Sequence, residues 1–257
     1  MNKDLDKVTA WSECNGLHIN PAKTQSLIIG YPRLLSQINL SDLPQLKINN
    51  IPIQFVKKAK YLGVTLNERL TWTDHVNETC GRVFRALHSL RRLLDSLPRN
   101  IRKLLVQSLI VPYFDYCDTI LTDLTDEMTL KLDRALNACV RFIFDLRRDD
   151  HVTQYYRALS WVRAKDRRNN HLLRQVHSLI QTQTPSYLAD AFKFINNSST
   201  RSELLLRPPI HRTTVANKSF LVAGCRAWNS LNSLPIEVRR LRGVGEFRRA
   251  VEKLNVL

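Results

Sequence analysis

The sequence lacks an apolar run long enough to cross a bilayer, and its first residues lack the hydrophobic core of a signal peptide. Both absences predict an intracellular protein, in the nucleus or the cytoplasm, with no membrane partner. Cysteine is sparse, because only five are present, they lie far apart, and no two form a CxxC pair. This spacing excludes a disulfide framework and a zinc site, and it predicts reduced, mostly buried thiols.

Acidic residues are also scarce. The 257 residues include 39 Lys and Arg but only 23 Asp and Glu, which gives a formal net charge of +16 and a pI near 10.0. Such an excess of positive charge favours a polyanionic partner, nucleic acid before a membrane surface. The apolar share of 44% is ordinary, so the chain is expected to bury a real core.

The common catalytic motifs are missing too, since no GxSxG, P-loop or HExxH pattern occurs. Asp115 and Asp118, in YFDYCDTI, are the candidate carboxylates for a metal pair, but they follow Pro112 at a helix end and no third acid lies in a strand nearby. We therefore expect solvated loop acids or helix caps. His171 and His177 stand at i and i+6, off a common helix face. The sequence predicts no metal site.

Residues 1–66 are predicted to hold one helix and several short strands. Residues 3–14 have helical spacing, and Gly16 suits the left-handed cap at the end of that helix. A two-residue Asn49-Asn50 turn between alternating apolar residues predicts a β-hairpin. Two further strand candidates precede it, at residues 17–20 and 26–29. The segment is too small to close a sheet by itself.

Residues 60–66 are predicted to form one more strand, because they are rich in β-branched and aromatic side chains. Gly63 would then lie in the middle of that strand. Glycine weakens the packing of a strand, so its presence there indicates a bulge or the close approach of a ligand or another backbone.

Helical patterns dominate from residue 74 onward. An apolar stripe follows one helix from Val76, a second helix begins near Pro98, and Thr125 suits the N-cap of a third. The predicted fold class is α+β, mostly α. Its expected domains are a β-hairpin segment at residues 1–66, a three-helix bundle at 67–148 and a basic helical domain at 149–257. The last is expected to contain helices near 162–181 and 245–254 and loops at 185, 196–199 and 208–209.

Basic residues cluster on the helices of the expected bundle, and acids are sparse beside them. A solvated helix face is one interpretation of such a cluster. Clustered basic helices are also how proteins contact a phosphate backbone. The residues predicted to bind nucleic acid are Arg82, Arg85, Arg91, Arg92, Arg99, Arg102 and Lys103.

Several short motifs occur in an order that resembles a known family. They are NGLHINPAKTQSLIIG (15–30), KYLGVTLNERLTWTDHV (60–76), VPYFDYCD (111–118), LNACVRFIF (136–144), PSYL (185–188), TRSELLLRPP (200–209) and AWNSLNSLPIEVR (227–239). In this order they resemble the end of the palm, the thumb and the C-terminal helical region of the reverse transcriptase of non-LTR (LINE-type, jockey-like) retrotransposons.

This resemblance implies roles for individual residues. Lys23 matches the palm lysine that acts as general acid on the departing pyrophosphate, a role it would fill only within a complete palm. Tyr61, Leu62 and Gly63 match the primer grip, where glycine would let the nucleic-acid backbone come close. The helices from residue 74 to about residue 145 match the thumb. The implied partners are an RNA template, a DNA primer or their hybrid duplex.

The chain departs from the family at the catalytic centre, because it has neither the early palm aspartate nor the Y-x-D-D turn that precedes the lysine motif. It is therefore expected to be a C-terminal fragment that does not polymerise alone. We expect no cofactor in this chain, and Mg²⁺ only with a complete polymerase. Three other interpretations are open: a nucleic-acid-binding module with a separate cellular role, a decayed reading frame without function, and a nuclease that would depend on Asp115 and Asp118.

Overall fold

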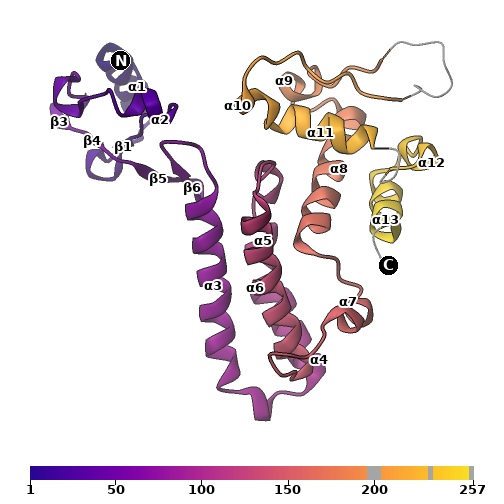
Figure 1. Cartoon of the computed structure of the whole chain (residues 1–257). Coiled ribbons are helices and arrows are strands. Elements are labelled where there is room, and N and C mark those ends of the chain that lie inside the picture. The colour runs from indigo at the N-terminus through magenta and orange to yellow at the C-terminus, as the bar shows by residue number, and fades with distance from the viewer. Residues whose placement is uncertain (196–203, 231–233, 255–257) are drawn as a thin grey trace. The chain divides into compact units, whose positions relative to one another are not determined.

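The computed structural model describes residues 1–195, 204–230 and 234–254, and the chain divides into two compact units, residues 1–77 and 78–257 (Figure 1). Helices form most of the described chain and the strands are short, so the fold is α+β and mostly α, as predicted. The predicted loop at 196–199 and the motif parts at 200–203 and 231–233 lie outside the described residues. None of the described helices is long and apolar enough to cross a membrane.

The first unit is held by a small apolar core. Leu46, Ile48 and Ile53 are buried, and the partly buried Leu5 and Ile19 pack against them. The elements of this unit are α1 (Asn2–Cys14), η1 (Pro21–Lys23), β1 (Gln25–Ser26), α2 (Pro32–Leu35), η2 (Leu40–Asp42), β2 (Lys47–Ile48), β3 (Ile51–Pro52), β4 (Gln54–Phe55), β5 (Lys58–Tyr61) and β6 (Val64–Asn67).

The local predictions for this unit are confirmed where a residue that tolerates a positive φ sets the backbone conformation. Gly16 follows α1 with φ of +68°, and the predicted hairpin is β2–β3, with Asn49 and Asn50 at φ of +48° and +63°. Both asparagines thus have the positive φ that a two-residue hairpin turn requires. Of the strand predicted at 26–29, only Ser26 belongs to a strand, β1, which pairs in parallel with β4. The strand predicted at residues 17–20 does not form.

The prediction of one strand over residues 60–66 is wrong. The segment is a second hairpin, in which β5 and β6 pair antiparallel from Lys58↔Asn67 to Tyr61↔Val64. Leu62 and Gly63 form its two-residue turn with φ of +45° and +82°. Gly63 is therefore present because the turn needs a positive φ, which glycine adopts without a steric penalty, and not because a strand has a bulge.

The second unit consists of helices. Thr125 caps α6 as predicted, accepting a hydrogen bond from the Met128 amide, and Pro98 is the N-cap of α4. The elements are α3 (Thr73–Arg91), which crosses the boundary between the units, η3 (Leu94–Ser96), α4 (Arg99–Leu105), the π-helical turn η4 (Val106–Ile110), α5 (Val111–Asp115), η5 (Asp118–Ile120), α6 (Asp126–Phe144), α7 (Thr153–Leu159), α8 (Ala164–Thr182), α9 (Ser186–Ala189), α10 (Thr214–Asn217), α11 (Phe220–Asn229), α12 (Ile236–Arg239) and α13 (Val244–Leu254).

A stack of three rings forms the centre of the core between α8, α11 and α13. The His177 ring lies 4.0 Å from the Phe247 ring at an angle of 11°, and the Trp228 ring lies 5.9 Å from that of Phe247. His177 is fully buried, and its Nε2 lies 2.7 Å from the Leu241 carbonyl oxygen. Since a carbonyl oxygen can only accept, Nε2 carries a proton, and the neutral form of the ring is the Nε2–H tautomer.

Close contact between α8 and α11 depends on Gly224. A Cβ atom at this position would lie 2.9 Å from Val176 Cγ2 and 3.2 Å from the Phe192 ring. Any larger residue would therefore force these side chains or the helix to shift.

Acidification should destabilise the second unit through His177. Burial lowers the pKa of His177 below its ordinary value of 6.5, so the unfolded chain gains a proton that the folded chain resists. The free energy of unfolding should fall as pH drops below 6.5, by up to about 1.4 kcal/mol per pH unit. Urea denaturation at a series of pH values, followed by circular dichroism, measures this slope.

The matched control is His88→Gln, because His88 is exposed on α3. That variant should keep the pH dependence, whereas His177→Phe should lose most of it. Equal slopes for the parent and His177→Phe would show that His177 is not the titrating group.

Candidate functional site

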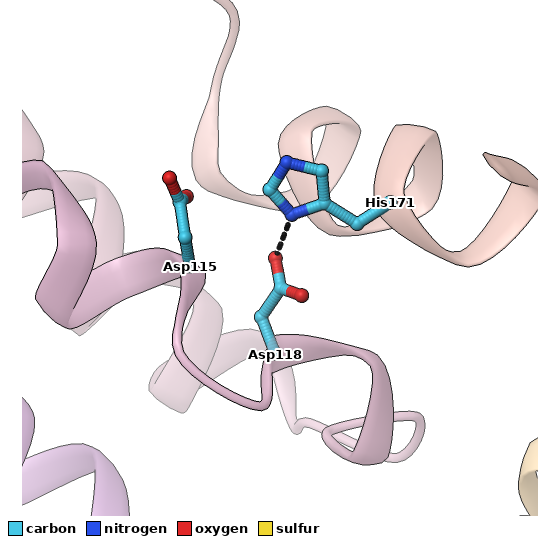
Figure 2. Close-up of side chains that lie close together, drawn as sticks. All are labelled: Asp115, Asp118 and His171. Carbon is cyan, nitrogen blue, oxygen red and sulfur yellow. Dashed lines mark hydrogen bonds and ion pairs between the residues drawn. The ribbon is translucent and has the colours of Figure 1, made fainter. Parts of the chain in front are cut away.

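Two acids, Asp115 and Asp118, lie close to His171 where the turn after α5 contacts α8 (Figure 2). Asp115 ends α5, a short helix that follows the π-helical turn η4 and contains Pro112. Asp118 begins η5, and Cys117 between the two acids has a left-handed backbone with φ of +54°. This tight turn brings both carboxylates toward α8, and the side chain of Asp118 is only 3% exposed.

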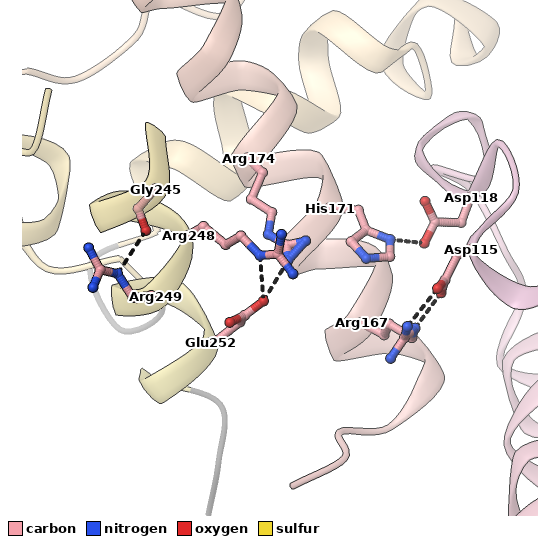
Figure 3. Close-up of polar contacts among 9 residues, drawn as sticks. All are labelled: Asp115, Asp118, Arg167, His171, Arg174, Gly245, Arg248, Arg249 and Glu252. Atoms are coloured by element: carbon pink, nitrogen blue, oxygen red, sulfur yellow. Dashed lines mark hydrogen bonds and ion pairs between the residues drawn. The ribbon is translucent and has the colours of Figure 1, made fainter. Parts of the chain in front are cut away.

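Each acid pairs with a base on the same face of α8 (Figure 3). Arg167 holds Asp115 with two bonds, one from Nε to Oδ1 and one of 2.6 Å from Nη2 to Oδ2. His171 Nδ1 lies 2.6 Å from Asp118 Oδ2. Arg167 and His171 are four residues apart, so one helix turn separates them. Burial raises the pKa of Asp118, and the His171 contact partly offsets this effect.

The expectation that Asp115 and Asp118 are solvated loop acids is wrong. Their partners lie some fifty residues further along the chain, as the sequence numbers show, and no local pattern connects them. The sequence placed His171 and His177 off a common helix face, and His177 does lie elsewhere, in the aromatic stack.

The same cluster has the donor atoms for a metal ion, since the ligand atoms of Asp115, Asp118 and His171 all lie within 4.8 Å of one another. Both Asp115 oxygens, however, face the Arg167 guanidinium. A fixed positive charge at that position opposes a divalent cation. The residues therefore fit an ion-pair network and do not fit the Mg²⁺ pair of a polymerase, which needs carboxylates free to bridge two ions.

A basic groove of about 790 Å³ lies between α3 and α6. Four arginines and one acid, Asp145, line it, and the ring of Phe84 is 48% exposed at its side. Arg134 and Arg141 lie seven residues apart, so both face the groove from the same side of α6. We call this feature the α3/α6 groove; its arginines are Arg91, Arg134, Arg141 and Arg148.

Of the seven basic residues predicted to bind nucleic acid, only Arg91 lines this groove. Arg85, Arg92 and Arg99 are exposed, and Lys103 is half-buried. Arg99 lies over the Phe144 ring, 5.2 Å from its centroid.

Two of these seven residues have structural partners. Arg82 pairs with Glu78 at 2.5 Å, one helix turn away. Arg102 donates to the carbonyl oxygens of Leu97 at 2.7 Å and Phe142 at 3.4 Å, and so links α4 to α6. The groove arginines that the sequence did not single out, Arg134, Arg141 and Arg148, come from α6 and the turn that follows it.

The residues predicted from the resemblance lie in the first unit. Lys23 ends the short helix η1 and is exposed. Tyr61 and Leu62, 67% and 73% exposed, form the tip of the β5–β6 hairpin with Gly63. An exposed hairpin tip suits contact with a partner, but the structure assigns no role to these residues.

Comparison with protein-family models, with curated proteins and with solved structures gives no match. The resemblance to reverse transcriptases therefore depends on the sequence motifs alone.

Arg167→Ala should lower the free energy of unfolding by roughly 1–3 kcal/mol, because Asp115 would lose its charged partner beside the buried Asp118. Lys165→Ala, an exposed change on the same helix, is the control and should have little effect. Urea denaturation measures both. In a double-mutant cycle with Asp115→Asn the two losses should not add, and strict additivity would contradict the pairing.

Proposed function

We propose that the second unit binds the phosphate backbone of duplex nucleic acid through the α3/α6 groove, as the template–primer-binding part of a non-LTR retrotransposon reverse transcriptase. The observation that carries this proposal is the charge of the groove, where four arginines face a single acid. The motif order supports the polymerase context. An intracellular location, in the nucleus or the cytoplasm, belongs to the same proposal.

Arginine suits this role for a physical reason. Its guanidinium is planar, stays charged, and can give a phosphate two parallel hydrogen bonds. Arg91 and Arg134 are exposed, so a phosphate can reach them without a large rearrangement. Arg141 also donates to the carbonyl oxygens of Arg147 and Asp150, which fixes the turn that carries Arg148. The groove is thus partly preorganised, and ordering it costs little on binding.

Two other candidates use the same observations differently. A nucleic-acid-binding module with a separate cellular role would bind through the same groove, but it would not act together with a polymerase. A decayed reading frame without function would show no saturable binding. Salt-dependent binding that requires the groove arginines would exclude the decayed reading frame. It would be expected both for the polymerase part and for the separate module.

The proposed role is binding and not synthesis, so the purified chain should extend no primer on a primed RNA template with nucleotides and Mg²⁺. Asp115 and Asp118 are held by Arg167 and His171, which leaves no pair of free carboxylates in this cluster. A gel assay of labelled primer measures extension. Extension by the parent that disappears in Asp115→Asn/Asp118→Asn would overturn this assignment.

Arg91→Ala/Arg134→Ala should weaken duplex binding and flatten its salt dependence. Phosphate contacts release counterions, so the log–log slope of affinity against salt should fall by up to about 1.8 when two contacts are lost. All duplex sequences should be affected alike, because phosphates carry no sequence information. Fluorescence anisotropy of a labelled hybrid duplex over a salt series gives the slope.

Lys3→Ala/Lys7→Ala removes the same charge from exposed positions of α1 and is the matched control. It should bind like the parent. If both double variants weaken binding equally, overall charge and not the groove is responsible.

A further inference from the structure

A second basic cavity lies apart from the α3/α6 groove, among the end of α7, α8 and α13. Its volume is about 890 Å³, and it contains five arginine or lysine residues against two acids, Asp115 and Glu252. We call it the α8/α13 cleft; its cationic residues are Arg167, Arg174, Arg248, Arg249 and Lys253. This size is typical of sites for small ligands or for a few units of a polymer.

Both acids of the cleft are paired with arginines of the same chain. Asp115 is bound by Arg167, and Glu252 accepts from Arg174 Nη2 at 2.6 Å and from Arg248 Nε at 3.0 Å (Figure 3). Burial raises the pKa of Glu252, but the hydrogen bonds from the two arginines outweigh it and lower that pKa, so Glu252 is ionised at neutral pH.

The outer face of α13 therefore has an excess of positive charge. Arg249 donates from Nε to the Gly245 carbonyl at 3.3 Å, a bond that fixes the side chain without neutralising it. Lys253, one turn further along, is exposed. Among the residues that the structure describes, no carboxylate pairs with Arg249 or Lys253. Arg248 is 62% exposed despite its bond to Glu252.

An aromatic ring forms part of the wall of this cleft. Ser160 ends α7 in a left-handed conformation with φ of +55°, and the Trp161 amide donates to the Tyr156 carbonyl at 2.9 Å. This turn places the half-buried Trp161 in the cleft lining, together with the side-chain amides of Gln107 and Asn170. An indole beside several cations can stack on a base while the cations bind its phosphates.

We propose that the α8/α13 cleft binds single-stranded nucleic acid, with Arg248, Arg249 and Lys253 on the phosphates and Trp161 stacked on a base. A base in a duplex is stacked on its neighbours, so only an unpaired strand can offer one to Trp161. A lipid surface fits less well, because none of the residues lining the cleft is an exposed large apolar side chain. This site does not depend on the proposed duplex binding at the α3/α6 groove.

The test uses the full chain and a labelled single-stranded oligouridylate, with affinity measured by anisotropy over a salt series. Arg249→Ala/Lys253→Ala should flatten the log–log salt slope by up to about 1.4, the value for two contacts on a single strand. Trp161→Ala should weaken binding by about 5- to 150-fold, the usual effect of losing one stacked base, while Trp161→Phe should retain most of the affinity.

Two further variants keep this proposal separate from the duplex groove. Arg91→Ala/Arg134→Ala should leave oligouridylate binding near the parental value, and Lys3→Ala/Lys7→Ala should leave it unchanged. Thermal melting of every variant must match the parent, so that lost affinity reflects lost contacts. Rescue by Trp161→Phe provides the same safeguard for the aromatic position.

Three outcomes would overturn the proposal. The first is parental affinity and slope for Arg249→Ala/Lys253→Ala. The second is full affinity for Trp161→Ala, which would show that the cleft binds charge alone. The third is displacement of oligouridylate by polyglutamate at equal charge concentration, which would make an acidic protein segment the better ligand. If Arg91→Ala/Arg134→Ala loses duplex binding and none of these three outcomes occurs, the results support both proposals.

Discussion

Burial of one helix, α8, holds the second unit together. Its apolar face packs against α11 and α13, and Leu173 and Val176 are fully buried there. Burying one such side chain contributes about 1.5–3 kcal/mol. The polar face of the same helix carries Arg167 and His171, which bind the two acids after α5. Because both faces are occupied, α8 fixes the positions of the elements that line the basic cleft.

The scarcity of acids explains how this arrangement leaves basic surfaces. Several of the few carboxylates are used inside the fold, since Asp115 and Asp118 bind α8, Glu252 joins α8 to α13, and Asp133 accepts from the Ala164 amide at the start of α8. Each of these contacts satisfies a structural requirement and pairs an acid with a group inside the protein. The exposed arginines of α3, α6 and α13 then have few neighbours to neutralise them, which favours an external anion.

Local features of this fold could be predicted from sequence, whereas contacts between distant segments could not. Asn49-Asn50 predicts its hairpin because asparagine tolerates a positive φ, and Thr125 predicts its helix start because its hydroxyl can accept from the first turn. The sequence does not predict the turn at Gly63, because the apolar residues on both sides of this short turn resemble one continuous strand. Only the packing of the helices shows which residues pair with Asp115 and Asp118. The same is true of the α6 arginines that lie beside Arg91.

The two basic surfaces should respond differently to ionic strength. Contact with a duplex at the α3/α6 groove would be almost wholly electrostatic, with a slope near −0.9 per phosphate, and salt would weaken it steeply. At the α8/α13 cleft the slope per phosphate is lower, near −0.7, and salt does not screen the stacking on Trp161. Rising salt should therefore shift this chain from duplex toward single-stranded nucleic acid. The difference in slope is a property of the two nucleic acids, so a uniform positive surface would share it; only the stacking on Trp161, which salt does not screen, distinguishes the cleft from such a surface.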